Sequence, residues 1–459
     1  MSVDDHSDDN VKRNSDLPVT PPTQKPLPTQ LSSPVGTSDR FASVDMLRGF
    51  ALLGILVINI ITMALPDMAL NNPTIAGGDT GLDLATWGVA DILFFQKFMS
   101  IFSMLFGAGL ILMFNRAEGS GVEFRKIYYR RLRWLLIIGL IHAYFIWWGD
   151  ILVFYALVGL ILYPLRRVSP RWLIVPAIIM ILVASSLYFG IGRFFEYASE
   201  TAADAQVALN ADETLDTEQE MMQKMWKEMS RDLMPSPEYI AQEIETQRGG
   251  YAGIFISRAE KVIMLQTAGL VMFIAWFIGG MMLLGMALMK LGVFSGERST
   301  RFYKTMMVIG YGAGLPFVIY GAYRLIVADF NILVEFTVSG PITYVFSPLV
   351  ALGHVGAVML AYKNGFLPKL QARLAAVGRM ALTNYLMHSI VMTTIFYGYG
   401  LGQFNRFSRF ELLGFVFSMW ALQLYLSPWW LKRFRFGPVE WLWRTVTYRK
   451  FQPMRLEGK

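Results

Sequence analysis

The chain has 459 residues, of which 54% are hydrophobic and only 16% are charged, with a formal net charge of +7 and no cysteine. A soluble protein of this length needs more charged surface, so the composition indicates that many apolar residues face a lipid bilayer. The absence of cysteine excludes disulfides, thiol chemistry and cysteine-based metal sites. In a membrane protein, the positive net charge is better explained by basic cytoplasmic loops than by a nucleic-acid partner.

The N-terminal segment, residues 1 to about 40, is rich in Pro, Ser, Thr, Asp and Asn and almost free of aromatic residues. Such a segment cannot bury enough apolar area to offset the entropy lost on ordering. We therefore expect residues 1–40 to form a disordered cytoplasmic tail.

Ten apolar runs follow, each long enough to cross a hydrocarbon core. They lie near residues 47–65, 88–114, 132–148, 151–167, 172–192, 262–289, 304–327, 342–362, 379–398 and 410–431. The expected fold is an all-α, polytopic membrane helix bundle of about ten transmembrane helices, which occupies residues 41–431.

Basic residues set the expected orientation of these runs. The connections after the even-numbered runs hold many Lys and Arg residues, whereas the loop at 66–86 contains Asp67, Asp79 and Asp83 but no Lys or Arg. The positive-inside rule then places both termini and the basic loops in the cytoplasm.

Two further segments follow from this orientation. Residues 193–260 form an acidic external loop, with short amphipathic helices on either side of Pro235 and Pro237, and this loop acts either as a lid or as a surface insertion. Residues 432–459 interleave Trp and Phe with Arg and Lys, which is typical of a tail that lies along the cytoplasmic membrane interface.

Charged residues gather at the cytoplasmic mouth of the first runs. Asp45 and Arg48 are three residues apart and share a helical face. Arg48 can either extend to lipid headgroups or bind a phosphorylated ligand through its planar guanidinium. Arg130, Arg131 and Arg133 lie at the same side of the bilayer, so the group suits an anionic ligand from the cytosol.

Three histidines, His142, His354 and His388, lie inside apolar runs. A polar side chain in a membrane span is costly unless it is partnered, so such residues mark a functional interior or an interhelical hydrogen bond. A neutral imidazole can act as a general base. The three histidines lie on separate runs without the short spacing of a metal site, so we expect no metal.

Two further polar residues belong to this set of candidates. Asp150 is eight residues beyond His142, about 12 Å along an ideal helix, so the two can bond only if the chain folds back after Gly149. Asp150 can also cap the helix that follows it. Asn59 is fourteen residues beyond Asp45 and therefore lies in the outer half of the membrane.

Several of these pieces resemble a known family. They are Asp45-Met-Leu-Arg48-Gly49, Phe102-Ser-Met-Leu-Phe-Gly107, Gly139-Leu-Ile-His142, Gly149-Asp150-Ile-Leu, Gly378-Arg-Met-Ala-Leu-Thr-Asn-Tyr385 and Phe434-Arg-Phe-Gly-Pro-Val-Glu-Trp441. With them, the chain resembles the YeiB-like family of bacterial inner-membrane proteins, which carry a domain of unknown function. The resemblance implies a multi-pass protein of the bacterial cytoplasmic membrane.

That family is distantly similar to transmembrane acyltransferases of the heparan glucosaminide N-acetyltransferase type, through the Asp-x-x-Arg-Gly sequence that begins at Asp45. Many related sugar O-acyltransferases have a histidine where this chain has Asn59, and the N-acetyltransferase-like branch has asparagine there. The resemblance therefore implies acyl transfer, but it does not supply the usual histidine of the first span. His142 or another histidine would have to replace it.

Two functions are weighed on this basis. As an acyltransferase, the protein would take acyl-CoA as a co-substrate, hold its phosphates on the arginines, and use His142 as base and Asp150 to orient it, with a hydroxyl or amine of a glycan or lipid as acceptor. As a secondary transporter, it would relay protons through the histidines. The two halves of the chain share no repeat, which favours the enzyme. An assembly protein with purely structural polar groups is the third alternative.

Overall fold

A computed structural model of the protein describes residues 42–118 and 124–456. The expected all-α class is confirmed, since every regular element in these ranges is helical and the β structure there is limited to one isolated bridge, between Phe434 and Arg455. The tail expected at residues 1–40 lies outside the described residues.

The helices follow one another with short connections. They are α1 (Ala42–Ala64), α2 (Gly81–Leu93), α3 (Lys97–Glu118), α4 (Phe124–Phe145), α5 (Leu152–Leu162), α6 (Pro170–Asn210), α7 (Thr217–Leu233), α8 (Pro237–Arg248), α9 (Tyr251–Met264), α10 (Ala275–Lys290), α11 (Thr300–Val327), α12 (Ile332–Val334), α13 (Gly340–Lys363), α14 (Pro368–Arg379), α15 (Ala381–Phe396), α16 (Arg409–Leu431) and α17 (Pro438–Tyr448). Two π-helical segments, Leu265–Ile274 and Glu335–Ser339, join α9 to α10 and α12 to α13. Short 3₁₀ turns occur at Asp67–Leu70, Pro73–Ala76 and Tyr163–Arg167.

Several of these helices are long and apolar enough to cross a bilayer, so the protein is an integral membrane protein. Six such segments occur among the described residues: Ala42–Ala64, Gly81–Glu118, Pro170–Asn210, Thr300–Val327, Ile332–Lys363 and Arg409–Leu431. A seventh forms if Tyr251–Met272 and Ala275–Lys290, which meet at 64°, are taken as one bent span. Each long span needs about 20 apolar residues.

The other expected spans coincide with helices that are too short or not apolar enough to cross a bilayer on their own. α5 has 11 residues and α15 has 16, whereas α4 has 22 but begins with a basic segment. Each of these apolar runs therefore correctly predicted a helix. The run does not determine how long the helix is, or whether the helix crosses the bilayer by itself. The count of ten transmembrane helices stays a prediction.

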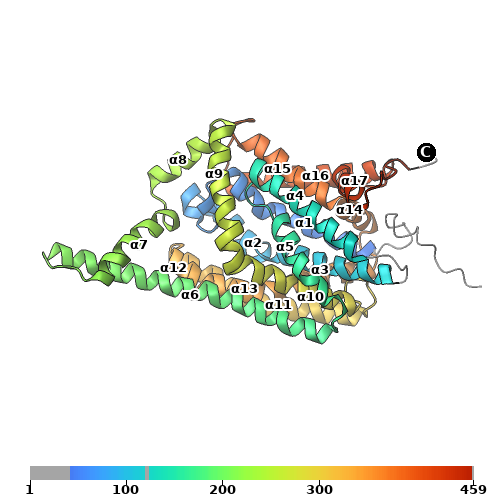
Figure 1. The fold of residues 1–459 in the computed structure, drawn as a ribbon, viewed down its shortest axis with the longest axis horizontal. Helices are drawn as coiled ribbons and strands as arrows, with labels where there is room; N and C mark the ends of the chain where they lie inside the picture. The colour runs from blue at the N-terminus through green and yellow to red at the C-terminus, as the bar shows by residue number, and fades with distance from the viewer. Residues whose placement is uncertain (1–41, 119–123, 457–459) are drawn as a thin grey trace, which may run out of the picture.

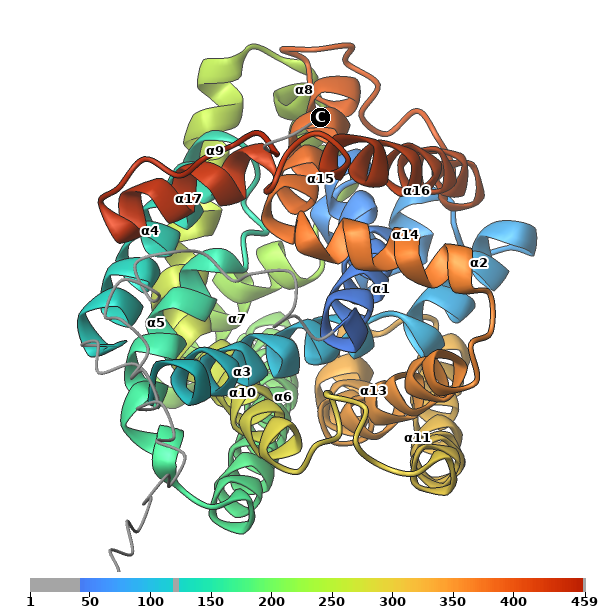
Figure 2. The same cartoon turned by 90° about the vertical axis from the view of Figure 1, so that its right-hand side faces the viewer.

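The bundle has two ends of different character (Figure 1). α7 and α8 lie at one end, whereas α14, α17 and the first turn of α1 lie at the other. Figure 2 looks onto this second end and shows α14 and α17 in front of the bundle. α6 was expected to end near residue 192, but it continues to Asn210 and α7 packs back along it.

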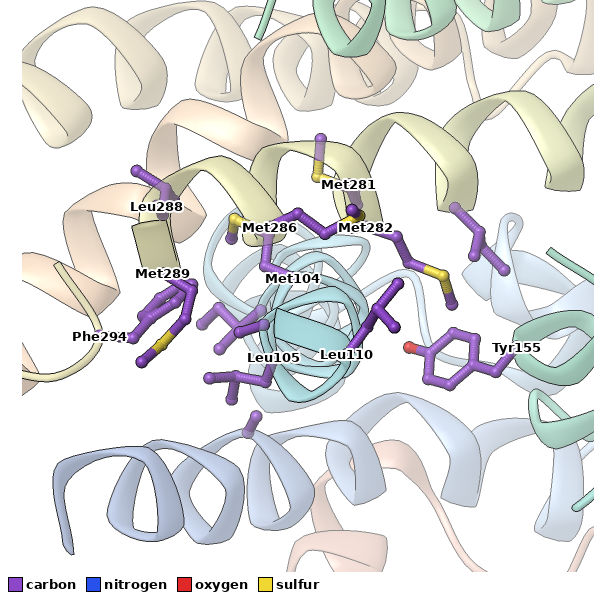
Figure 3. Packing of buried hydrophobic residues seen from close by; sticks show 14 of the residues in the cluster. Met104, Leu105, Leu110, Tyr155, Met281, Met282, Met286, Leu288, Met289 and Phe294 are labelled. Carbon is purple, nitrogen blue, oxygen red and sulfur yellow. The ribbon is translucent and has the colours of Figure 1, made fainter. Parts of the chain in front are cut away.

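The core is built around α3 and α10. Figure 3 shows Met104 of α3 beside Met282 and Met286 of α10. Two glycines let these backbones meet, because a Cβ atom at Gly107 would lie 2.0 Å from the Met282 carbonyl oxygen and one at Gly285 would lie 1.9 Å from that of Met104. Small residues permit this close approach of membrane helices.

A second close contact joins α1 to α14. A Cβ atom at Gly378 would lie 1.8 Å from the Asp45 carbonyl oxygen, and one at Gly49 would lie 2.0 Å from that of Leu374. The contact fixes the start of α1 against the end of α14. It therefore brings Arg48 and Arg379, which are far apart in the sequence, to the same end of the bundle.

Candidate functional site

The first feature of the site is a buried pair between His142 and Asp150. α4 ends at Phe145 and the chain reverses before α5 begins, so the fold-back that this contact requires does take place. Nδ1 of His142 lies 2.7 Å from Oδ2 of Asp150, and both side chains are 1% exposed. Because Nδ1 is engaged by the carboxylate, Nε2 is the nitrogen left for other chemistry, and it has no partner among the described residues.

Asp150 also has a structural role. Its second carboxylate oxygen, Oδ1, accepts a hydrogen bond from the backbone N–H of Val153 at 2.8 Å. This bond satisfies one of the free N–H groups in the first turn of α5. The capping role expected for Asp150 and its contact with His142 are therefore compatible, because they use different oxygens.

Tyr385 lies beside this pair, and Tyr155 shares cavity walls with it. The Tyr385 ring centroid is 5.2 Å from that of His142, and the Tyr385 hydroxyl accepts a hydrogen bond from the backbone N–H of Ile151 at 3.3 Å. The Tyr155 hydroxyl is 2.8 Å from that of Ser103. Both tyrosines line two separate cavities, so they form the wall that the cavities share.

The first cavity, called here the outer cavity, has a volume of about 820 Å³ including its open side. Its lining is mostly aromatic and apolar, and it includes Asn59 and Gln96. Gln96 has a φ of +65° at the break between α2 and α3, a left-handed conformation that is rare outside glycine. Gln96 Oε1 and the indole nitrogens of Trp147 and Trp148, which also line this cavity, are buried without a partner. A purely apolar ligand would leave these polar atoms unsatisfied.

The second cavity, called here the inner cavity, has a volume of about 1050 Å³ including its open side. Four arginines line it: Arg48, Arg131, Arg379 and Arg444. They come from α1, α4, α14 and α17, so separate parts of the chain contribute to one positive surface. Burial lowers the pKa values of Arg379 and Arg444 from their usual range, because removal from water disfavours the charged guanidinium.

The same cavity contains one acidic residue, Glu440. Its Oε1 accepts hydrogen bonds from the backbone N–H groups of Leu382 at 2.6 Å and Thr383 at 3.0 Å. Burial raises the pKa of Glu440, whereas these hydrogen bonds lower it. The carboxylate thus caps the start of α15, and the arginines remain the groups available to a ligand.

The predicted arginines separate into two sets. Arg48 and Arg131 line the inner cavity, and Arg48 is bonded to Asp45 at 3.1 Å. Arg130 instead donates to the Thr447 carbonyl at 2.9 Å, and Arg133 is exposed.

Arg131 is fixed by the C-terminal tail. Its guanidinium lies 3.6 Å from the centroid of the Trp443 ring, and the Trp443 indole donates to its backbone carbonyl at 2.9 Å. The predicted interfacial tail thus also packs inside the fold.

The other two histidines are bonded elsewhere. His354 lies 2.8 Å from the Tyr311 hydroxyl through Nδ1 and 2.9 Å from the Leu93 carbonyl through Nε2. His388 Nε2 lies 2.9 Å from Gln423 Oε1 on α16. Each of these contacts joins two helices, which is the structural alternative that the sequence left open. Among the described residues, no group of three or more acidic or histidine side chains is placed to hold a metal.

The structure adds residues that sequence reasoning missed. Tyr155, Arg379 and Arg444 line the two cavities, and Asp91 and Glu335 line a third, smaller one. Arg379 belongs to the Gly378–Tyr385 motif, so its position in that motif was an available signal. Nothing in the sequence distinguishes Tyr155 from the other tyrosines of the apolar runs.

The fold and these cavities define an integral membrane protein of the all-α class, with a buried histidine–carboxylate pair next to Tyr385, which lines both cavities. The model of the family described as "Protein of unknown function (DUF418)" matches residues 288–450. The chain belongs to the YeiB-like family, since it is 34% identical over 431 residues to "Uncharacterized protein YeiB" of Escherichia coli, with 90% of this chain and 98% of that protein covered.

Two other relatives extend the comparison. "Uncharacterized protein YxaH" of Bacillus subtilis is 31% identical over 439 residues, with 93% of this chain and 98% of that protein covered. "Uncharacterized 39.9 kDa protein in amylase 3'region" of Bacillus acidopullulyticus is 24% identical over 427 residues, with coverage of 92% and 98%. No solved structure matches the chain.

Proposed function

We propose that this protein is a transmembrane acyltransferase of the bacterial cytoplasmic membrane. It transfers an acyl group from a cytosolic acyl-CoA to a hydroxyl or amine of an acceptor that enters from the other side. The observation that carries the proposal is the wall formed by Tyr155 and Tyr385, which line both cavities, with the His142–Asp150 pair directly beside it.

The inner cavity is the proposed donor site. The arginine side chains of Arg131, Arg379 and Arg444 match the phosphate groups of a coenzyme A ester, because guanidinium groups bind phosphate oxygens through two donors at once. Nε of Arg379 is buried without a partner among the described residues, so this side chain has an unused donor. With the phosphates on the arginines, the acyl thioester would extend toward Tyr155 and Tyr385.

His142 is the proposed base. The acceptor oxygen or nitrogen would form a bond to the thioester carbonyl carbon while its proton passes to Nε2 of His142. The carbon–sulfur bond then breaks, and the proton goes to the departing thiolate to give free coenzyme A. Asp150 holds Nδ1–H, which keeps Nε2 unprotonated and stabilises the charged ring. His142 does not itself line the two cavities, so a rotation of Tyr385 would have to open Nε2 to them.

A transporter is the second candidate. The same two cavities, separated by a two-tyrosine wall, are also what a gated pathway for a solute requires. A transporter would move its solute without making a covalent product. His354 and His388 have hydrogen-bond partners that join helices, so the chain of protonatable histidines that this alternative invoked gains little support.

The test is transfer of radiolabelled acetyl groups from acetyl-CoA to acceptors in a bacterial membrane extract, catalysed by the purified protein. We expect a labelled product with the unmodified protein and with His388→Gln, and a loss of product with His142→Ala, each compared at equal amounts of folded protein. Product that persists unchanged in His142→Ala would contradict the assignment of the base. Solute uptake into proteoliposomes without any labelled product would favour the transporter.

A further inference from the structure

The lining of the outer cavity contains no Asp, Glu, Lys, Arg or His among the residues that the structure describes. Its walls come from α1, from the break between α2 and α3, from the connection between α4 and α5, and from α5 and α15. The inner cavity, in contrast, is lined by four arginines and a glutamate. The two cavities therefore differ in the charge of the ligand that each can hold.

A charged ligand would meet no opposite charge in the walls of the outer cavity. Burial of an ammonium, carboxylate or phosphate group is costly unless an opposite charge and hydrogen bonds offset the loss of water. The His142–Asp150 pair lies beside Tyr385 and does not line the cavity. An alkyl amine is protonated near neutral pH, so it would have to lose its proton before it entered, whereas an alcohol enters uncharged.

Most of the cavity wall is apolar. Ile55 and Ile58 of α1 and Phe98 and Met99 of α3 are part of it. An apolar body that leaves water for such a wall gains free energy in proportion to the area it buries. A sugar, in contrast, would bury several hydroxyl groups, each of which needs a hydrogen-bond partner. The wall therefore favours a ligand whose body is apolar.

A few polar atoms of the lining residues are left unsatisfied. Gln96 Oε1 can only accept a hydrogen bond, the indole nitrogens of Trp147 and Trp148 can only donate one, and all three are buried without a partner among the described residues. A hydroxyl both donates and accepts, so one hydroxyl can serve an acceptor and a donor together. An ammonium group can only donate, and a carboxylate can only accept.

We propose that the outer cavity binds an uncharged alcohol with an apolar body, whose hydroxyl bonds to Gln96 and to an indole N–H. Within acyl transfer this alcohol is the acceptor, and to that extent the inference rests on the proposed function. The hydroxyl oxygen forms a bond to the thioester carbonyl carbon, and the carbon–sulfur bond breaks. The hydroxyl proton passes through His142 to the departing thiolate, so the products are an ester and free coenzyme A.

The test uses the absence of cysteine from the chain, because a single introduced thiol then reports on the cavity by its rate of labelling with N-ethylmaleimide. Met99→Cys places this thiol in the cavity lining, and Ile55→Cys is a second reporter if Met99→Cys does not fold. Asp79→Cys is the control, since Asp79 is exposed and does not line the cavity.

Four soluble competitors separate charge from polarity. Hexanol, hexylamine and hexanoate share one apolar chain and differ in charge, whereas glucose is uncharged but has no apolar body. We expect hexanol to slow the labelling of Met99→Cys and to leave that of Asp79→Cys unchanged. The other three should need at least about tenfold higher concentrations for the same effect, because the walls offer the ions no opposite charge and the sugar few partners.

Gln96→Glu, added to Met99→Cys, tests the same argument by a gain of binding. The substitution places a negative charge in the lining, so hexylamine should then protect the thiol better than it does with Gln96. Two sources share the proposed chemistry, a small soluble alcohol and a membrane lipid with a free hydroxyl. Protection by dioleoylglycerol in nanodiscs would support the lipid source, and protection by hexanol alone would support the soluble one.

Two results would overturn the inference. One is that hexanol leaves the labelling of both cavity reporters unchanged, and the other is that hexylamine, hexanoate or glucose protects at the same concentration as hexanol. Transfer of labelled acetyl groups from acetyl-CoA to hexanol or hexylamine is measured separately. Protection by hexanol without any labelled ester would contradict the proposed function alone, whereas transfer to hexylamine in preference to hexanol would contradict this inference alone.

Discussion

The inner and outer cavities of this protein differ in how their charges are satisfied. The inner cavity has four arginines, and its one acid, Glu440, is already occupied by backbone N–H groups. The outer cavity has aromatic and apolar walls with a few unpaired polar atoms, those of Gln96, Trp147 and Trp148. The first arrangement suits a polyanion, and the second suits a largely apolar group that carries a few hydrogen-bonding atoms.

This difference matters because the two cavities meet at one wall. Tyr155 and Tyr385 line both, and the His142–Asp150 pair lies beside Tyr385. Nε2 of His142 is buried there without a partner among the described residues, which is uncommon for a buried polar atom. If the cavities bind different ligands and share this centre, substitutions in each cavity and at the centre should have separable effects.

Asp150→Asn should have the largest effect, since both cavities serve the base that Asp150 orients. Asparagine retains an oxygen that can cap α5, but it removes the charge that holds His142 Nδ1–H. We expect transfer of labelled acetyl groups to fall by about 100-fold or more, with little change in the thermal midpoint of unfolding. If Asp150→Asn were as active as the unmodified protein, the role of Asp150 would be limited to capping α5.

Arg131→Ala should affect only the inner cavity. Removing one guanidinium that binds phosphate should weaken acetyl-CoA binding by about 10- to 150-fold, since a hydrogen bond to a charged group contributes about 1.5–3 kcal/mol. Calorimetry measures this effect, with Arg133→Ala as the matched control, because Arg133 is exposed on the same helix. Asn59→Ala, which changes the outer cavity, should leave the affinity for acetyl-CoA unaltered. If Asn59→Ala lowered this affinity as much as Arg131→Ala does, the two cavities would not be distinct donor and acceptor sites.

Gly378→Ala should destabilise the rim of the inner cavity. The added methyl group would lie 1.8 Å from the Asp45 carbonyl oxygen, so α1 and α14 would have to separate. Overpacking of this kind costs about 1–3 kcal/mol, which thermal unfolding in detergent would record as a lower midpoint. Gly312→Ala is the control, because a Cβ atom there meets nothing within 4 Å. Equal midpoints for the two variants would mean that this contact does not hold the donor site together.

The smallest expected effect lies outside the bundle, at Asp67. Burial raises the pKa of Asp67 to about 6, an effect that its ion pair with Lys261 opposes and its neighbour Glu243 reinforces. The folded state therefore binds this proton more tightly than the unfolded state, so the contribution of Asp67 to stability is full below pH 4 and is lost as pH rises to about 6. The thermal midpoint should fall across this range more in the unmodified protein than in Asp67→Asn. Parallel curves would show that Asp67 does not titrate there.

The sequence predicted the parts of the site that local pattern determines. A lone histidine in an apolar run indicated His142, and the Gly149 break allowed Asp150 to fold back onto it. Local pattern could not show which arginine of Arg130 and Arg131 faces the cavity, because neighbouring residues of a helix point in different directions. Sequence also could not show that α14 and α17 bring Arg379 and Arg444 to Arg48, since that depends on tertiary contacts such as Gly378 against Asp45.

The predicted spans show that the sequence also leaves the length of a helix undetermined. The apolar run at 151–167 predicted a crossing helix, but α5 ends at Leu162 and gives way to a 3₁₀ turn. Hydrophobicity indicates that a segment is buried or faces lipid, but it does not fix the length over which α-helical hydrogen bonds continue.

The most direct test of the central claim is an experimental structure of the protein with acetyl-CoA bound. We expect the phosphates to contact Arg131, Arg379 and Arg444, and the thioester to lie at the wall formed by Tyr155 and Tyr385. Acetyl-CoA bound elsewhere, or bound with its thioester away from these tyrosines, would contradict the claim that the two cavities exchange an acyl group at His142.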